Sequence, residues 1–204
     1  SAPAEPKYAL AWAMLVCASA ALTLAHPALA GGFLVNPRSD QFIAGYAFRD
    51  YAAQMLRSDG QFPLWNPYLL GGMPYVDAMH GDIFYPTFLL RMLLTTDVAM
   101  TWGMILHVWL AGVAAYSLFR AHGIAFYASL VGGLAYMMSG MIAGLVSPGH
   151  DGKIFVSALF PLALLVLRFG VRDGRRWAWG ALALVVGLGV LTPHPQLLQY
   201  MLLA

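Results

Sequence analysis

The sequence predicts an all-α polytopic membrane protein, with about five transmembrane helices and a long loop on one side of the bilayer. Composition is the first indication, since 60% of the residues are hydrophobic and only 10% are charged. The second is that the charges fall between apolar blocks and not within them. Spanning about 30 Å of hydrocarbon takes roughly 20 apolar residues per helix, and several blocks approach that length.

Five apolar blocks are expected to form these helices, at residues 8–30, 98–119, 124–146, 154–167 and 177–191. The first block has a rival interpretation as a secretory signal peptide, because Ala28-Leu29-Ala30 resembles a cleavage site. Its length favours a retained helix. A sixth apolar run begins at Leu197 and reaches the last residue, so we expect this chain to be the N-terminal portion of a longer polytopic protein.

Three regions follow from these blocks: an N-terminal tail with the first helix (1–31), a loop (32–97) and a transmembrane bundle (98–204). Within the loop, apolar residues recur every four positions from Ile43 to Met55, which predicts a helix over 42–57 that rests on the membrane or the bundle. Arg49 is expected to lie mostly away from the apolar stripe. A second short helix is predicted over 83–94, with Tyr85-Pro86 at its start and Arg91 as an interfacial anchor.

The distribution of Lys and Arg predicts the orientation. With a cytoplasmic N-terminus, one side of the membrane is net positive, with Lys7, Arg120, Arg168, Arg172, Arg175 and Arg176 against Glu5 and Asp173. The other side is net negative and contains the loop. We therefore expect a protein of the bacterial inner membrane with a periplasmic or extracellular loop.

The loop and the later turns carry a series of motifs in a fixed order. They are Asp40, Phe62-Pro63-Leu64-Trp65-Asn66-Pro67-Tyr68, Gly71-Gly72-Met73-Pro74, Gly81-Asp82-Ile83-Phe84-Tyr85-Pro86, Gly149-His150 and His194-Pro195-Gln196. In this order they resemble bacterial YfhO-type membrane proteins of the GT-C glycosyltransferase superfamily. The resemblance implies a polyprenyl-phosphate-linked sugar as donor, an acidic catalytic residue in the first extracytoplasmic loop, which Asp40 matches, and often a divalent metal.

Sugar transfer from a lipid phosphate needs a general base and groups that stabilise the departing phosphate. Asp40 suits the first task, while Arg38 or Arg49 could bind phosphate oxygens and a hard divalent cation could bridge carboxylates and phosphate. Further candidate metal or substrate ligands share the predicted membrane face with Asp40; they are Asp82, His150, Asp151 and His194.

Each of these residues also has a structural interpretation. Asp40, or Ser39 before it, could cap the 42–57 helix, and Asp82 could cap the 83–94 helix. His150-Asp151 lies in a turn whose residues need no further role. His194, beside prolines, could satisfy backbone groups between two helices.

His107 lies inside the second apolar block, four residues after Gly103, a spacing that would allow a haem or chlorophyll-type pigment to approach. An interhelical hydrogen bond is the more common role of such a histidine. A second function therefore stays open, that of a non-catalytic polytopic subunit packed against a larger photosynthetic or respiratory complex. No basic run suggests nucleic acid, and Cys17 is expected to be a packing residue.

Overall fold

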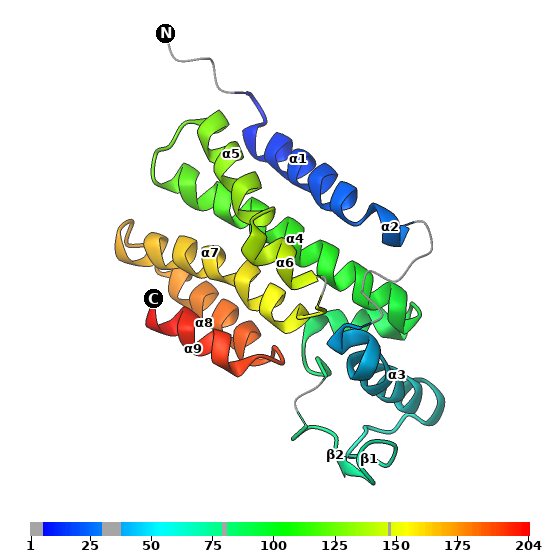
Figure 1. Ribbon diagram of the computed structural model, residues 1–204. Coiled ribbons are helices and arrows are strands. Elements are labelled where there is room, and N and C mark those ends of the chain that lie inside the picture. The colour runs from blue at the N-terminus through cyan, green and yellow to red at the C-terminus, as the bar shows by residue number, and fades with distance from the viewer. Residues whose placement is uncertain (1–5, 30–37, 79–80, 147) are drawn as a thin grey trace.

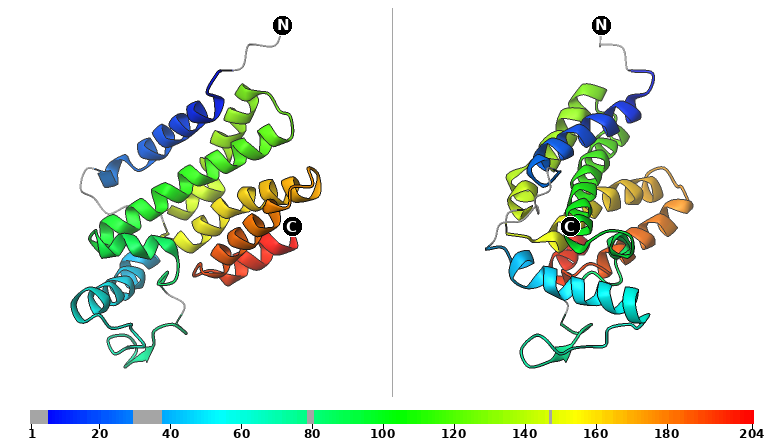
Figure 2. Two further views of the ribbon diagram at one scale, coloured as in Figure 1. Left: turned by 180° about the vertical axis from the view of Figure 1, so that it is seen from behind. Right: turned by 90° about the vertical axis from the view of Figure 1, so that its right-hand side faces the viewer.

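The computed structural model is mostly helical, and it describes residues 6–29, 38–78, 81–146 and 148–204 (Figure 1). The apolar helices lie side by side as a bundle, and the loop region gathers at one end of it (Figure 2). The helices of the bundle are α1 (Ala9–Leu24), α2 (His26–Leu29), α4 (Thr96–Ala121), α5 (Phe126–Met137), α6 (Gly140–Val146), α7 (Asp151–Val171), α8 (Trp177–Val190) and α9 (Pro195–Leu203).

Three segments are long and apolar enough to cross a membrane, judged by length and composition: α4, α7, and α5 together with α6. They correspond to the predicted blocks 98–119, 124–146 and 154–167, although α7 is longer than predicted and begins at Asp151. Helices α1 and α8 are apolar but shorter. The first block breaks at Ala25, two residues before Pro27, and its predicted end at Ala30 lies outside the described residues.

The centre of the bundle is a close contact among α1, α4 and α5. A Cβ on Gly133 of α5 would lie 2.7 Å from the backbone oxygen of Gly112 in α4, so only glycine allows this approach. Cys17 of α1 is fully buried beside Gly112 and Met137. The packing role predicted for Cys17 is therefore confirmed.

The predicted helix over 42–57 is confirmed as one continuous helical stretch. It consists of a π-helical turn η1 (Gln41–Gly45), α3 (Tyr46–Gln54) and a second π-helical turn η2 (Met55–Asp59). Gly60 ends it in the left-handed conformation, with φ of 63°. The predicted orientation was wrong in part, because Ile43 is 69% exposed and Arg49 is buried.

The rest of the loop is built from turns. A two-residue ribbon joins β1 (Trp65–Asn66) to β2 (Met73–Pro74) in antiparallel register. A short 3₁₀ helix, η3 (Pro86–Met92), follows Tyr85 and replaces the longer helix predicted over 83–94. Arg91 is buried, so its predicted role as an interfacial anchor was wrong.

Candidate functional site

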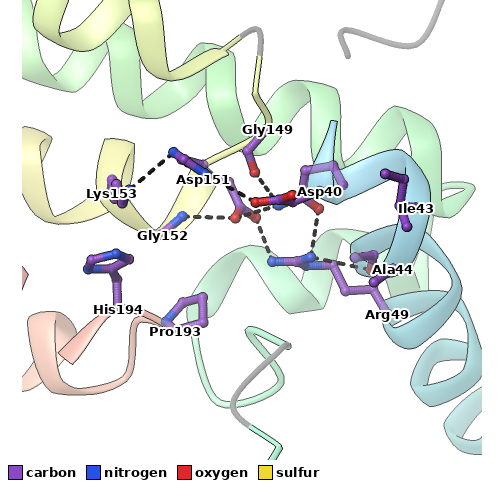
Figure 3. A pocket seen from close by; sticks show the side chains of 13 residues that line it. Asp40, Ile43, Ala44, Arg49, Gly149, Asp151, Gly152, Lys153, Pro193 and His194 are labelled. Carbon is purple, nitrogen blue, oxygen red and sulfur yellow. Dashed lines mark hydrogen bonds and ion pairs between the residues drawn. The ribbon is translucent and has the colours of Figure 1, made fainter. Parts of the chain in front are cut away.

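A cavity of about 480 Å³ lies at the end of the bundle where the loop packs (Figure 3). Three segments far apart in sequence form it: the start of the η1–α3 stretch, the turn before α7, and the turn between α8 and α9. The lining residues include Asp40, Gln41, Ile43, Ala44, Arg49, His150, Asp151, Lys153, Pro193 and His194. Four of the predicted ligands thus meet Arg49 in one pocket.

Asp40 presents its carboxylate to this pocket because its neighbour caps the helix. The Ser39 hydroxyl accepts a hydrogen bond from the Phe42 N–H at 3.2 Å, whereas the Asp40 side chain caps nothing. The Asp40 N–H donates to the Pro148 carbonyl at 3.1 Å and so fixes the helix start against the turn before α7. The Asp40 side chain is 76% exposed, which leaves its carboxylate open to a ligand.

A chain of polar contacts runs from Asp40 through His150 to Lys153. His150 Nε2 lies 3.2 Å from Asp40 Oδ2, and His150 Nδ1 lies 3.2 Å from Lys153 Nζ. An ammonium group can only donate hydrogen bonds, so His150 Nδ1 accepts the hydrogen bond from Lys153. Nε2 then bears a hydrogen and donates it to the Asp40 carboxylate, so the imidazole links Asp40 to Lys153.

His194 faces the same pocket from the α8–α9 turn. Its Nδ1 accepts a hydrogen bond from the Leu197 N–H at 3.2 Å and caps α9, which is the backbone role that the sequence left open. Burial, followed by the charge of Lys153, lowers the pKa of His194. The imidazole is therefore held neutral at pH 7, with one nitrogen committed to the helix.

A network of buried ion pairs adjoins the pocket, and its members Arg49 and Asp151 line the pocket wall. Arg49 Nε lies 3.0 Å from Asp82 Oδ1, and Arg49 Nη2 lies 2.6 Å from Asp151 Oδ2. Arg91 Nη1 lies 2.8 Å from the same Asp82 oxygen. Gln41 Nε2 donates to Asp151 Oδ1 at 2.6 Å, and Gln41 Oε1 accepts from Arg49 Nη1 at 2.7 Å. Two arginines thus balance two aspartates.

Ion pairing opposes the effect of burial in this network; it prevails at Asp82 and Arg49, whereas burial raises the pKa of Asp151 overall. Burial would raise the pKa of Asp82, but the charges of Arg91 and Arg49 outweigh it and lower that pKa to about 2. Burial likewise lowers the pKa of the Arg49 guanidinium, yet the charges of Asp151 and Asp82 raise it overall. The Asp82 side chain does not cap η3; it joins α3 to η3 through Arg49 and Arg91.

Arg38 and Arg49 differ in their access to the pocket. Arg38 is exposed and does not line the pocket. Arg49 lines it, but its Nε, Nη1 and Nη2 atoms all point to protein oxygens. The phosphate-binding role predicted for these two arginines stays a prediction.

His107 lies away from the pocket and joins α4 to the start of η3. Its Nδ1 donates to the Gly103 carbonyl and its Nε2 accepts from the Tyr85 hydroxyl, each at 2.7 Å. The ring stacks on Phe155 at 4.0 Å between centroids. Both nitrogens of His107 are thus engaged within the protein, and the interhelical hydrogen-bond role applies to this ring; pigment ligation stays a prediction.

The described residues of the pocket supply few candidate metal ligands. Within the described residues, no three His, Cys, Asp or Glu side chains are grouped so as to hold an ion. Asp40 offers a carboxylate oxygen, but both nitrogens of His150 are engaged by Asp40 and Lys153. Mg²⁺ prefers octahedral oxygen ligands and takes several from water or phosphate. The divalent metal implied by the resemblance stays a prediction, and no chemical step below depends on it.

Lys153 and Gln41 complete the pocket, although no site role was predicted for either of them; Arg91, predicted as an interfacial anchor, belongs to the adjoining ion-pair network. A signal existed for Lys153, which follows His150 by three residues at a helix start and so falls on the same helical face. Gln41 had no such signal, since its partner Asp151 lies 110 positions away in the sequence.

Fold and site together define a helical protein of membrane type with a polar pocket at one end of an apolar bundle. The chain matches no protein-family model, no curated protein and no solved structure. Its resemblance to YfhO-type proteins thus rests on the motifs alone.

Proposed function

We propose that this protein transfers a sugar from a polyprenyl-phosphate carrier, as a GT-C-like glycosyltransferase or the N-terminal part of one. The observation that supports this most is the exposed Asp40 carboxylate, held by His150 at the mouth of a cavity of about 480 Å³. The cavity lies where an apolar bundle meets a polar loop. A donor with a prenyl tail and a charged sugar head needs such a boundary.

In this proposal Asp40 is the general base. The acceptor hydroxyl oxygen bonds to the anomeric carbon of the sugar while its proton passes to the Asp40 carboxylate. The bond between the anomeric carbon and the phosphate oxygen breaks, and the lipid phosphate leaves with the electron pair. The His150 N–H holds one Asp40 oxygen, which directs the other toward the acceptor.

Lys153 is a cation of the same pocket and is linked to this base through His150. Its ammonium group contacts His150 and lines the cavity, so it is placed to stabilise the phosphate that departs. Lys153 therefore joins Arg38 and Arg49 as a proposed phosphate ligand. A divalent cation, when bound, would add charge stabilisation between phosphate and Asp40.

We further propose that α1 and α8 also cross the membrane, which gives five spans with α9 as the start of a sixth. The N-terminus would be cytoplasmic and the pocket periplasmic in a bacterial inner membrane. The charge distribution supports this orientation, because the α4–α5 and α7–α8 turns, at the end away from the pocket, contain Arg120, Arg172, Arg175 and Arg176 (Figure 1).

Replacing Asp40 by asparagine is the direct test. We expect Asp40→Asn to lower transfer from a polyprenyl-phosphate sugar by roughly 10²–10⁴-fold, because the amide cannot take the proton. Helix content and detergent stability should not change, since Ser39 retains the cap. Transfer is measured in membranes or proteoliposomes that contain the full-length protein.

The matched control is Asp59→Asn, which removes an exposed carboxylate at the other end of the same helical stretch. It should retain full transfer. An Asp40→Asn protein as active as the wild type would exclude Asp40 as the base.

A second function, that of a non-catalytic subunit, is favoured by the uneven burial of the long helices. Only 24% of the α5–α6 span is buried within this chain, against 67% of α4. The exposed face suits either lipid or other membrane subunits. If the protein is a subunit, it should co-purify with a larger complex in mild detergent, and its deletion should loosen that complex without altering lipid glycosylation.

A further inference from the structure

The α7–α8 turn lies at the end of the bundle away from the loop region (Figure 2), and its sequence contains a dense group of arginines. Residues 168–176 contain one acidic residue, Asp173, together with Arg168, Arg172, Arg175 and Arg176. The turn therefore has a strong net positive charge within a few residues.

Asp173 is shared by two of these arginines. Arg168 Nη1 lies 3.1 Å from Asp173 Oδ2, and Arg175 Nε lies 3.8 Å from the same oxygen. Within the part of the chain that the structure describes, the side chains of Arg172 and Arg176 form no ion pair or hydrogen bond, and both are exposed. Two guanidinium groups are thus left for a ligand from outside the chain.

The backbone of the turn is held firmly. The Arg175 N–H donates to the Phe169 carbonyl at 3.0 Å, and Gly174 adopts φ of 65°. The Arg175 guanidinium lies 4.9 Å from the centroid of the Phe169 ring, and Trp179 packs against Gly170. Arg172 and Arg176 therefore project from a fixed framework, which lowers the entropy lost when a ligand binds.

Two tryptophans indicate the depth of the turn in the membrane. Trp177 and Trp179 are 55% and 51% exposed, although they follow the arginines directly at the start of an apolar helix. Exposed tryptophan beside arginine at a helix end is typical of the level of the lipid headgroups. A phosphate of the bilayer is then the nearest anion to Arg172 and Arg176.

We propose that the α7–α8 turn binds the headgroup of an anionic phospholipid, with Arg172 and Arg176 as the phosphate ligands. A guanidinium can donate two parallel hydrogen bonds to phosphate, which a lysine cannot. Trp177 and Trp179 would fill the boundary beside the bound lipid. This site is separate from the pocket and does not depend on the proposed transfer reaction.

Lipid binding can be measured on the purified full-length protein after delipidation, by native mass spectrometry with phosphatidylglycerol or phosphatidylcholine. The wild type should retain phosphatidylglycerol selectively. Each of Arg172→Gln and Arg176→Gln should weaken that affinity roughly fivefold, since a basic residue near an anionic surface contributes about 1 kcal/mol. The double variant should weaken it by the product of the two effects.

Arg57→Gln is the matched control, because it removes an exposed arginine at the pocket end and should leave lipid selectivity unchanged. If the glutamine variants fold poorly, Arg172→Lys with Arg176→Lys retains the charge but not the bidentate geometry and should bind with intermediate affinity. Equal retention of both lipids by the wild type, or undiminished selectivity in the folded double variant, would overturn the proposal. Selective binding of an acidic peptide without lipid preference would overturn it as well.

Discussion

Replacing Arg49 by methionine is expected to destabilise the protein by about 3–5 kcal/mol, the cost typical of removing one partner from a buried ion pair. Methionine matches much of the volume, so the loss is mainly electrostatic. Asp151 would remain buried without its cation, while Asp82 would still have Arg91 and the Thr87 hydroxyl, which donates to it at 2.9 Å. The loop would then lose its main connection to α7.

A charge-balanced double variant tests whether the unpaired charge of Asp151 causes the loss of stability. Arg49→Met with Asp151→Asn removes one charge of each sign and should recover much of the lost stability. Arg57→Met, on the exposed side of the same helical stretch, should stay within about 0.5 kcal/mol of the wild type. Unfolding in mixed detergent micelles gives the free energies. An Arg49→Met protein as stable as the wild type would show that the network contributes nothing.

Replacing Gly149 by alanine is expected to cost about 2–4 kcal/mol, from left-handed strain plus a close contact. Gly149 has φ of 78°, and a Cβ there would lie 2.5 Å from Gln41 Cγ and 3.1 Å from the Gln41 backbone nitrogen. The start of the helical stretch would have to move away from the turn before α7. Because Asp40 and His150 sit on these two segments, the pocket should lose its geometry, and any transfer activity should fall with stability.

The Gly71→Ala variant measures the left-handed backbone strain alone, without the close contact with Gln41 that Gly149→Ala adds. Gly71 has the same φ of 78°, but a Cβ there would meet nothing within 4 Å. This variant should lose only the strain of about 1–2 kcal/mol and retain the pocket. Thermal unfolding in detergent compares the two variants. Equal losses for both would mean that the contact with Gln41 has no effect.

The long helices could be predicted from the sequence because their cause is local. A helix in a bilayer satisfies its backbone hydrogen bonds within itself, so an apolar run of sufficient length is enough to indicate one. The block predicted over 98–119 differs from α4, Thr96–Ala121, by two residues at each end. The end of the loop helix at Gly60 and the start of η3 at Tyr85-Pro86 were predictable for the same reason.

The loop helix shows where local patterns fail. An arginine in a short amphipathic helix is expected to face water, and periodicity alone placed Arg49 there. Its burial depends on Asp82 and Asp151, which lie 33 and 102 positions away. Arg91 was misplaced for the same reason, since it pairs with buried Asp82. No local sequence pattern predicts that a buried arginine will be paired with a buried aspartate.

The sequence by itself determined that this chain is helical and apolar. It also indicated an asymmetric charge distribution, with basic turns at one end and most of the candidate site residues at the other. Those properties depend on composition and short spacings. Only the tertiary structure decided which of these residues share a pocket and what each one does there. It assigned the helix cap to Ser39 and the pocket to Asp40, and it placed Arg49 in the pocket wall with buried Asp82 behind it as an ion-pair partner. The physical reason is that a carboxylate can cap, pair or catalyse equally well, and only the partners within hydrogen-bond distance select among these roles.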